Sequence, residues 1–140
     1  MEFITTNGQK KVTINTATFK EMCDLKKEAM KCLQVAAQKD AINIEDLQSG
    51  KGINVIFEIL LTADTSEEFN SALFKCLGRC VYDEFHAITP KFFEDKPEAI
   101  EDYYEIVAKC VEVNLRPFFK SLLTAFKTYA QQAEKLKPQK

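Results

Sequence analysis

The stretch TSEEFNSALFKCLGRCV, residues 65–81, carries the clearest structural pattern in this sequence of 140 residues. Its apolar residues recur three and four positions apart, which places side chains on one face of an α-helix; they are Phe69, Ala72, Leu73, Cys76, Leu77, Cys80 and Val81. Thr65 and Glu68 have the spacing of a capping box, in which each side chain accepts a hydrogen bond from the other residue's backbone N–H. The stretch therefore predicts an amphipathic helix that packs one face on a core.

Helical patterns also occur on the N-terminal side of this stretch. Thr18 and Glu21 form another capping box, and the apolar stripe after them predicts a helix of about 20 residues that fades near Asp40. The glycines in residues 49–52 then indicate a loop. The segment Ile53 to Ala63 suits a buried strand by its β-branched residues and a central helix by its length. We favour a helix, because no second strand pattern is available to pair with it.

The C-terminal side predicts three more helical segments. A short turn begins at Thr89-Pro90, where proline is tolerated in the first helical turn, and carries two phenylalanines. A longer helix begins near Asp95 and Pro97 and must kink or restart near Pro117, because proline lacks a backbone donor. The last helix runs to about Ala133 and is followed by a frayed, lysine-rich tail.

The first 15 residues have the pattern of a β-hairpin. Asn7-Gly8 suits a two-residue type I′ turn, and counting outward from it pairs Phe3 with Val12 and Met1 with Ile14. An isolated hairpin is marginally stable in water, so it should lie on the helices. The sequence thus predicts a mainly α single domain over 1–140, with a hairpin at 1–15, a bundle of about four to five helices at 17–134 and a flexible tail at 135–140.

Composition excludes several classes of function. Apolar residues make up 46% of the chain and charged residues 29%, which indicates a folded globular protein. A formal charge of −2 gives no general attraction to nucleic acid or to an anionic membrane surface. The longest apolar stretch, Ile53 to Leu61, is too short to span a bilayer, and the N-terminus lacks a secretory signal. We therefore expect an intracellular protein.

No residue pattern predicts catalysis, a cofactor or a metal. The five cysteines have no paired spacing typical of disulfides or zinc, and Cys32, at the edge of its stripe, is the thiol most open to reagents. Cys76, Cys80 and the single histidine, His86, could in principle hold a transition metal. Both cysteines lie within an apolar stripe, however, where cysteine behaves as a small hydrophobic residue. A thiol enzyme that uses Cys32 or Cys80 is the least favoured interpretation.

The aromatic content points to a partner. The chain has 11 Phe and 4 Tyr, and Phe74 falls off the stripe of its helix. The adjacent pairs Phe92-Phe93 and Phe118-Phe119 cannot both face one core, so some rings should lie near the surface unless a loop covers them. An exposed apolar patch usually marks a protein-binding site.

Several segments resemble the tail assembly chaperones of long-tailed bacteriophages and prophages. They are Lys11-Val12-Thr13-Ile14-Asn15, Thr18-Phe19-Lys20-Glu21 with Leu25-Lys26, residues 74–80, residues 102–107 and residues 114–119. The resemblance implies a non-enzymatic protein in the bacterial cytoplasm. Such proteins bind the long tape measure protein, keep its helical segments from aggregating and help bring tail tube protein to it. Self-association is left open.

The best candidate for the client contact is the face of the last helix that carries Phe119, Leu122, Phe126 and Tyr129. The alternative is that this stripe packs against the protein's own core. A rival function is a small phage regulator that binds a host factor or nucleic acid through Lys26, Lys27 and Lys31, although lysines on the polar face of a helix are usually only solvated.

Overall fold

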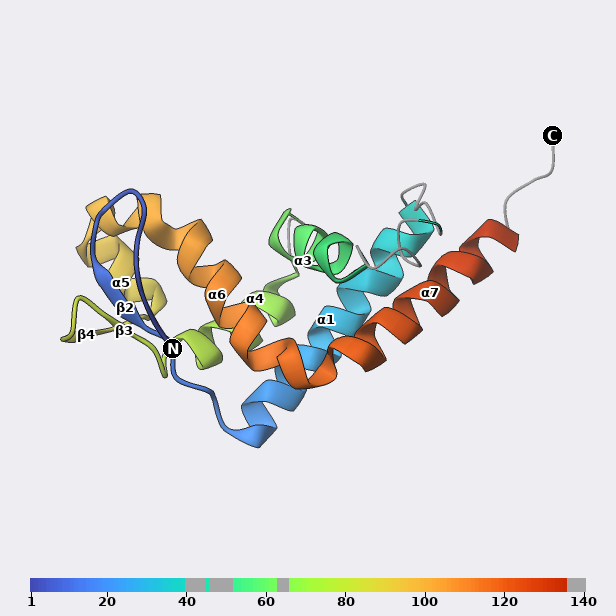
Figure 1. The fold of residues 1–140 in the computed structure, drawn as a ribbon, viewed down its shortest axis with the longest axis horizontal. Helices are drawn as coiled ribbons and strands as arrows, with labels where there is room; N and C mark the ends of the chain where they lie inside the picture. The colour runs from blue at the N-terminus through green and yellow to red at the C-terminus, as the bar shows by residue number, and fades with distance from the viewer. Residues whose placement is uncertain (40–44, 46–51, 63–65, 136–140) are drawn as a thin grey trace.

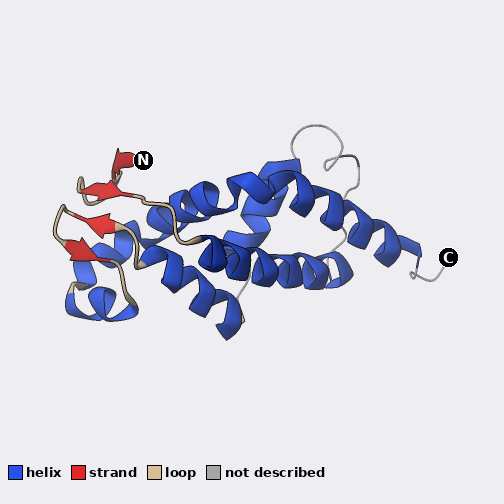
Figure 2. Cartoon of the chain, turned by 90° about the horizontal axis from the view of Figure 1, so that it is seen from below, coloured by secondary structure: helices blue, strands red, loops and turns tan. Residues whose placement is uncertain are grey.

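A small sheet lies at one end of the protein, and helices extend from it toward the C-terminus (Figure 1, Figure 2). The computed structural model describes residues 1–39, 45, 52–62 and 66–135. In chain order, the elements are β1 (Glu2–Ile4), β2 (Lys11–Thr13), α1 (Phe19–Lys39), α3 (Gly52–Thr62), α4 (Glu67–Leu77), β3 (Val81–Tyr82), β4 (His86–Ala87), α5 (Pro90–Asp95), the 3-10 helix η1 (Pro97–Asp102), α6 (Tyr103–Leu115), the 3-10 helix η2 (Arg116–Phe118) and α7 (Phe119–Lys135).

The mainly α fold class is confirmed, including the favoured helix over the ambiguous segment. α3 is helical from Gly52 to Thr62, and Ala63 lies outside the described residues. α5 begins at Pro90 as predicted, and the restart at Pro117 takes the form of η2. The predicted loop at 49–52 is wrong at Gly52, which is the first residue of α3, and its residues 49–51 lie outside the described residues. Most of the predicted tail, residues 136–140, lies outside them as well.

One of the two predicted capping boxes is confirmed. The Glu21 N–H donates to Thr18 Oγ1 at 3.2 Å, and the Thr18 N–H donates to Glu21 Oε1 at 3.1 Å, which starts α1. The box predicted at Thr65 is wrong by one residue. Ser66 caps α4, and its Oγ accepts the Phe69 N–H at 3.1 Å, while Thr65 lies outside the described residues.

The predicted register of the first hairpin is confirmed, but its turn is not type I′. Phe3 pairs with Val12 and Glu2 with Thr13. The Thr5 N–H donates to the Lys10 carbonyl and the Gln9 N–H to the Thr5 carbonyl, which closes a longer loop. The positive φ is at Gln9, 57°, whereas a type I′ turn would need it at Asn7 and Gly8.

A second hairpin, which no pattern in the sequence predicts, extends the sheet to the order β1-β2-β3-β4. β3 pairs with β2 through Val12 and Tyr82, and with β4 through Tyr82 and His86. Each new strand has only two residues, too few for an alternating pattern to be recognised. The turn has positive φ at Asp83 and Glu84, without the glycine that usually marks such turns.

Buried Asp102 ties both hairpins to the start of α6. Its Oδ1 accepts the Gly8 N–H at 2.9 Å, and its Oδ2 accepts the Tyr82 hydroxyl at 3.0 Å. Burial and this second bond raise the pKa of Tyr82 well above its usual range. The sheet therefore packs on η1 and α6 in one fixed position.

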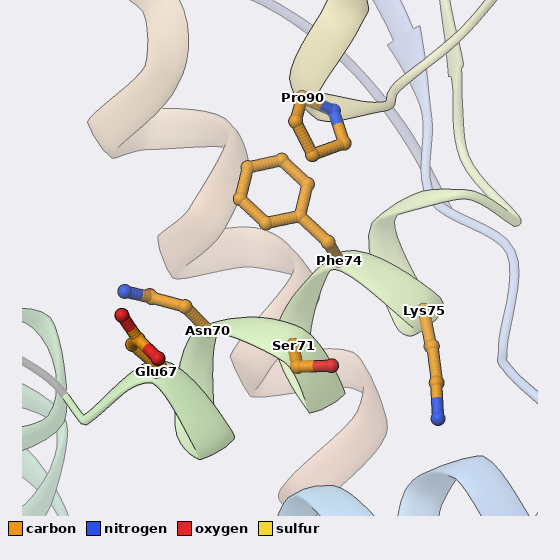
Figure 3. Close-up of a pocket in the computed structure, with 6 residues that line it drawn as sticks. All are labelled: Glu67, Asn70, Ser71, Phe74, Lys75 and Pro90. Atoms are coloured by element: carbon orange, nitrogen blue, oxygen red, sulfur yellow. The ribbon is translucent and has the colours of Figure 1, made fainter.

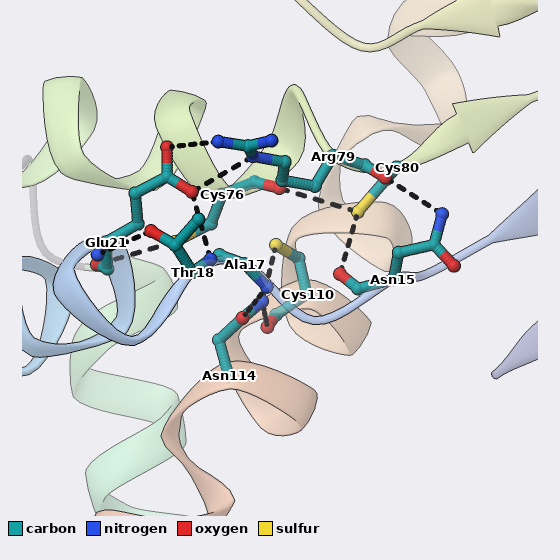
Figure 4. Close-up of polar contacts among 9 residues, drawn as sticks. All are labelled: Asn15, Ala17, Thr18, Glu21, Cys76, Arg79, Cys80, Cys110 and Asn114. Atoms are coloured by element: carbon teal, nitrogen blue, oxygen red, sulfur yellow. Dashed lines mark hydrogen bonds and ion pairs between the residues drawn. The ribbon is translucent and has the colours of Figure 1, made fainter.

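A second polar cluster fixes the segment between β2 and α1 (Figure 4). The Ala17 N–H donates to Asn114 Oδ1 at 2.9 Å, and Asn114 Nδ2 donates to the Cys110 carbonyl at 2.9 Å. Asn15 Nδ2 donates to the Arg79 carbonyl, at the end of α4. The Arg79 guanidinium reaches back to Glu21 in α1, with Nε 3.0 Å from Oε1. These bonds join α1, α4 and α6.

α1 is the central helix of the hydrophobic core, and α4 and α7 make the most extensive contacts with it. Figure 1 shows α1 and α7 running side by side toward the C-terminal end. α1 buries a stripe at four-residue spacing, Leu25, Ala29, Leu33 and Ala37, and α7 buries Leu122, Phe126 and Ala130. The two alanines of α1 allow a neighbouring helix to approach closely.

Two glycines should respond to alanine in opposite ways. A Cβ at Gly8 would overlap Asp102 Oδ2, which the Tyr82 hydroxyl holds in place, so Gly8→Ala should destabilise the protein by about 1–3 kcal/mol. Gly78 has right-handed helical φ and ψ of −63° and −15°, and a Cβ there meets only ordinary contacts. Gly78→Ala should therefore stabilise by about 0.4–1 kcal/mol. Urea unfolding measures both, and equal shifts would contradict the role given to Asp102.

Stability should depend on Glu21 at acid pH. The hydrogen bond from Arg79, and next the backbone bond from Thr18, hold the pKa of Glu21 below its ordinary value of 4.5. A carboxylate with a lowered folded pKa stabilises above its unfolded pKa and loses that contribution as the pH falls through the folded value. Unfolding free energy should therefore fall less steeply below about pH 4.5 in Glu21→Gln than in the wild type. Arg79→Ala should flatten the profile similarly; identical slopes in all three proteins would disprove the link.

Candidate functional site

α3 is apolar on nearly every side, although only part of it is buried. It carries seven large apolar residues and two clearly polar ones, Asn54 and Glu58. Ile56 and Leu60 are in the core. The other five, Ile53, Val55, Phe57, Ile59 and Leu61, keep some contact with solvent. A helix that is hydrophobic all round is normally covered on all sides, so α3 offers more apolar surface than the fold covers.

α3 meets the first turn of α7 through two aromatic rings. The ring centroids of Phe57 and Phe119 are 5.1 Å apart with an interplanar angle of 77°. This edge-to-face arrangement is one of the favourable geometries for a pair of aromatic rings. Both side chains are half-buried. We call the partly exposed side chains Ile53, Phe57, Phe119 and Tyr129 the α3–α7 surface.

The four residues predicted to contact the client, Phe119, Leu122, Phe126 and Tyr129, fall into two groups in the structure. Leu122 and Phe126 have no exposed surface, because they pack in the core that α7 shares with α1. Phe119 and Tyr129 are half-buried at the edge of that core. A partner could touch Leu122 and Phe126 only if α7 separated from α1. Whether any of the four contacts a partner stays a prediction.

The expectation about adjacent phenylalanines is wrong for Phe92 and Phe93, which are both buried. α5 lies between two parts of the structure. Phe92 packs against Tyr82, with centroids 5.0 Å apart, and Phe93 packs against Tyr103, at 5.2 Å. One ring therefore faces the sheet and the other faces the start of α6.

Phe118 and Phe119 do remain partly exposed, as predicted, with Lys26 Nζ 5.2 Å from the Phe118 ring centroid. The most exposed rings are elsewhere. Phe19 is 75% exposed at the start of α1, and Phe85 is 83% exposed in the β3–β4 turn. No periodic pattern marks Phe85, because this residue lies in a turn.

The lysines of the rival regulator hypothesis do not form a separate basic patch. Lys26 lies over Phe118, and Lys31 pairs with Glu28 at 3.1 Å. Lys27 lies in a polar groove that also contains Asp24 and Glu28. Acidic groups therefore accompany these cations, which reduces their attraction for phosphate.

The groups considered for chemistry are held in structural contacts. The His86 ring stacks on Phe92, and its Nε2 lies 2.9 Å from Lys96 Nζ. Cys76, Cys80 and Cys110 are buried between α4, α6 and the β2–α1 segment. Among the described residues, no group of three His, Cys, Asp or Glu side chains could hold a metal ion. Every helix in the described part of the chain is too short or too polar to cross a membrane.

Thiol reactivity should follow burial. Cys23 and Cys32 are half-buried, and the other three cysteines are buried. Burial raises the pKa of Cys76 to about 12, and the Cys80 thiol together with burial raises the pKa of Cys110. Ellman's reagent should therefore label two thiols in the native protein and all five in urea. Burial and then the Glu28 carboxylate raise the pKa of Cys32 as well, so its labelling should be slow. Fast labelling of a third thiol in the native protein would contradict the burial.

The comparisons with known proteins agree with the resemblance seen in the sequence. The family described as "Phage tail assembly chaperone protein, TAC" matches residues 8–127, which include all the described helices before α7 and the first half of α7. No curated protein and no solved structure gave a significant match. Since the family covers most of the chain, the chain belongs to the phage tail assembly chaperones, a non-enzymatic family.

Proposed function

We propose that this protein binds the tape measure protein of its phage or prophage in the cytoplasm of the bacterial host. It keeps the client soluble during synthesis and helps bring tail tube protein to it. The observation that carries this proposal within the family is the surplus apolar surface of α3, where five of seven large apolar residues remain partly exposed. Such a surface suits a partner that itself offers apolar helical faces.

The α3–α7 surface is the proposed contact for the client. Phe119 and Tyr129 are within reach of a partner in the described conformation, and Ile53, 37% exposed, lies one turn before Phe57 on α3. Leu122 and Phe126 are buried beneath this surface, where they pack α7 against α1. They would take part directly only in a state in which α7 is displaced.

Apolar contact fits the role better than charge. The protein has a formal charge of −2, and the lysines of α1 are accompanied by carboxylates, so neither favours nucleic acid as the partner. A client held mainly by apolar contact can be covered in more than one register, because apolar contacts lack direction. This property suits a chaperone for a long, repetitive helical protein.

Co-expression with the tape measure protein tests the proposal. The client should be largely insoluble alone and soluble with the wild-type chain. Ile53→Asp and Tyr129→Asp should each weaken the complex roughly tenfold, because each puts a charge where a large apolar group would be buried. Sedimentation of the lysate followed by affinity capture measures the soluble complex.

Thr128→Asp is the matched control. Thr128 is exposed and lies next to Tyr129, so this substitution adds the same charge to the same helix. The circular dichroism spectrum of each of the three variants must match that of the wild type, so that a loss of binding is not a loss of folding. Asp at position 53 lies in the first turn of α3, where a negative charge favours the helix. A wild-type yield of soluble complex from both test variants would remove this surface from the mechanism. Failure of the wild-type chain to solubilise the client would disprove the proposed function.

A further inference from the structure

A pocket of about 470 Å³ lies on the outward side of α4 (Figure 3). α4 supplies Glu67, Asn70, Ser71, Phe74 and Lys75, and the start of α5 supplies Pro90. The side chains of Phe74 and Pro90 lie next to each other, with Glu67 and Asn70 at one end of the pocket and Lys75 at the other. The pocket therefore has an apolar part between two opposite charges.

The apolar part is held rigidly. The Phe74 ring stacks on Tyr103 at 6.4 Å and meets Phe93 edge-on at 6.5 Å, so it is supported from two sides. Pro90 is fixed at the first turn of α5, where Thr89 Oγ1 accepts the Phe92 N–H. A preformed apolar pocket binds a side chain with little loss of conformational entropy in the protein. This explains why Phe74 falls off the core stripe of its own helix: its ring is half-buried and borders the pocket.

Both charges at the ends of the pocket also line the neighbouring groove that contains Asp24, Lys27 and Glu28. Glu67 and Lys75 are both exposed, and within the described residues neither forms an ion pair. They are eight positions apart on α4, which is about 12 Å along a helix axis. Two turns of another helix would span the same distance.

We infer that this pocket docks one amphipathic helix of the client, and this inference rests on the proposed function. The helix presents an acidic residue to Lys75, an apolar residue one turn later to Phe74 and Pro90, and a basic residue one further turn on to Glu67. The expected pattern is Asp or Glu, then a large apolar residue at i+4, then Lys or Arg at i+8. The contact is separate from the α3–α7 surface, so one chain can hold two client segments.

The order of the charges sets the direction. The acidic residue of the client meets the C-terminal end of α4, and the basic residue meets the N-terminal end, so the two helices run antiparallel. In this direction the client helix has its acid toward its own N-terminus and its base toward its own C-terminus, which its macrodipole favours. A parallel client would need the reverse order, against its own dipole.

Overlapping 25-residue peptides that cover the tape measure protein test the inference by fluorescence anisotropy. The peptides whose binding depends on this pocket should contain the acid–apolar–base pattern, whereas peptides held by the α3–α7 surface need not. Glu67→Lys and Lys75→Glu should each weaken their binding by about fivefold, because a charge reversal replaces an attraction with a repulsion. A peptide whose acid is changed to lysine should recover its affinity for Lys75→Glu and lose it for the wild type.

A third variant closes the pocket without removing a core side chain. Ser71→Arg places a long side chain four positions after Glu67, where the two can pair across the opening, and it should weaken peptide binding by about tenfold. Lys120→Glu, an exposed reversal on α7, is the control and should bind as the wild type does.

The outcomes separate this inference from the proposed function. Unchanged affinity of every binding peptide for all three pocket variants would overturn the inference, even if the wild-type chain keeps the full client soluble. So would a loss of affinity confined to peptides without the pattern. Self-association that Ser71→Arg abolishes, measured by analytical ultracentrifugation, would assign the pocket to a second copy and also overturn it. Loss of peptide binding in the pocket variants, together with recovered binding of the acid-to-lysine peptide to Lys75→Glu, would establish the pocket as a docking site for the client helix.

Discussion

The buried side-chain amide of Asn114 is the constraint on which the arrangement of this protein depends. It accepts the Ala17 N–H and donates to the Cys110 carbonyl, so one residue of α6 satisfies the backbone where the chain passes from the sheet into α1. A buried N–H without a partner would cost about 1–3 kcal/mol, so the segment has one favourable path. That path places the start of α1 against α6, and the ion pair between Glu21 and Arg79 then aligns α1 with the end of α4.

Asp102 has the corresponding role for the sheet, and both polar clusters lie in segments whose sequence resembles tail assembly chaperones. The segments similar to tail assembly chaperones include Asn15, Glu21, Arg79, Asp102 and Asn114. These residues supply the buried or bridging bonds between elements distant in sequence. These segments therefore belong to the framework of the fold, whereas α3 carries the surplus apolar surface, and the family match over residues 8–127 covers both.

This separation suits a protein that must stay folded while it binds an aggregation-prone client. Directional hydrogen bonds fix the sheet, α1, α4 and α6 relative to one another, and they do not depend on the apolar residues at the surface. α3 and the edge of α7 can then keep apolar side chains near solvent without loss of the core, because Ile56, Leu60, Leu122 and Phe126 anchor both helices from beneath.

The sequence by itself determined the features that depend on neighbouring residues. Periodic apolar stripes located the helices, reciprocal side-chain bonds located the start of α1, and alternation about Asn7-Gly8 gave the register of the first hairpin. Only the tertiary structure decided the features that depend on distant residues. β3 and β4 exist because β3 pairs with β2, some 70 positions earlier in the chain, and the loop at Gly8 takes its shape beside Asp102. Phe92 and Phe93 are both buried because α5 has partners on two sides, and Leu122 and Phe126 are covered because α1 lies along α7. A stripe shows which side chains share a face, but what covers that face is set by packing between segments that the local sequence does not specify.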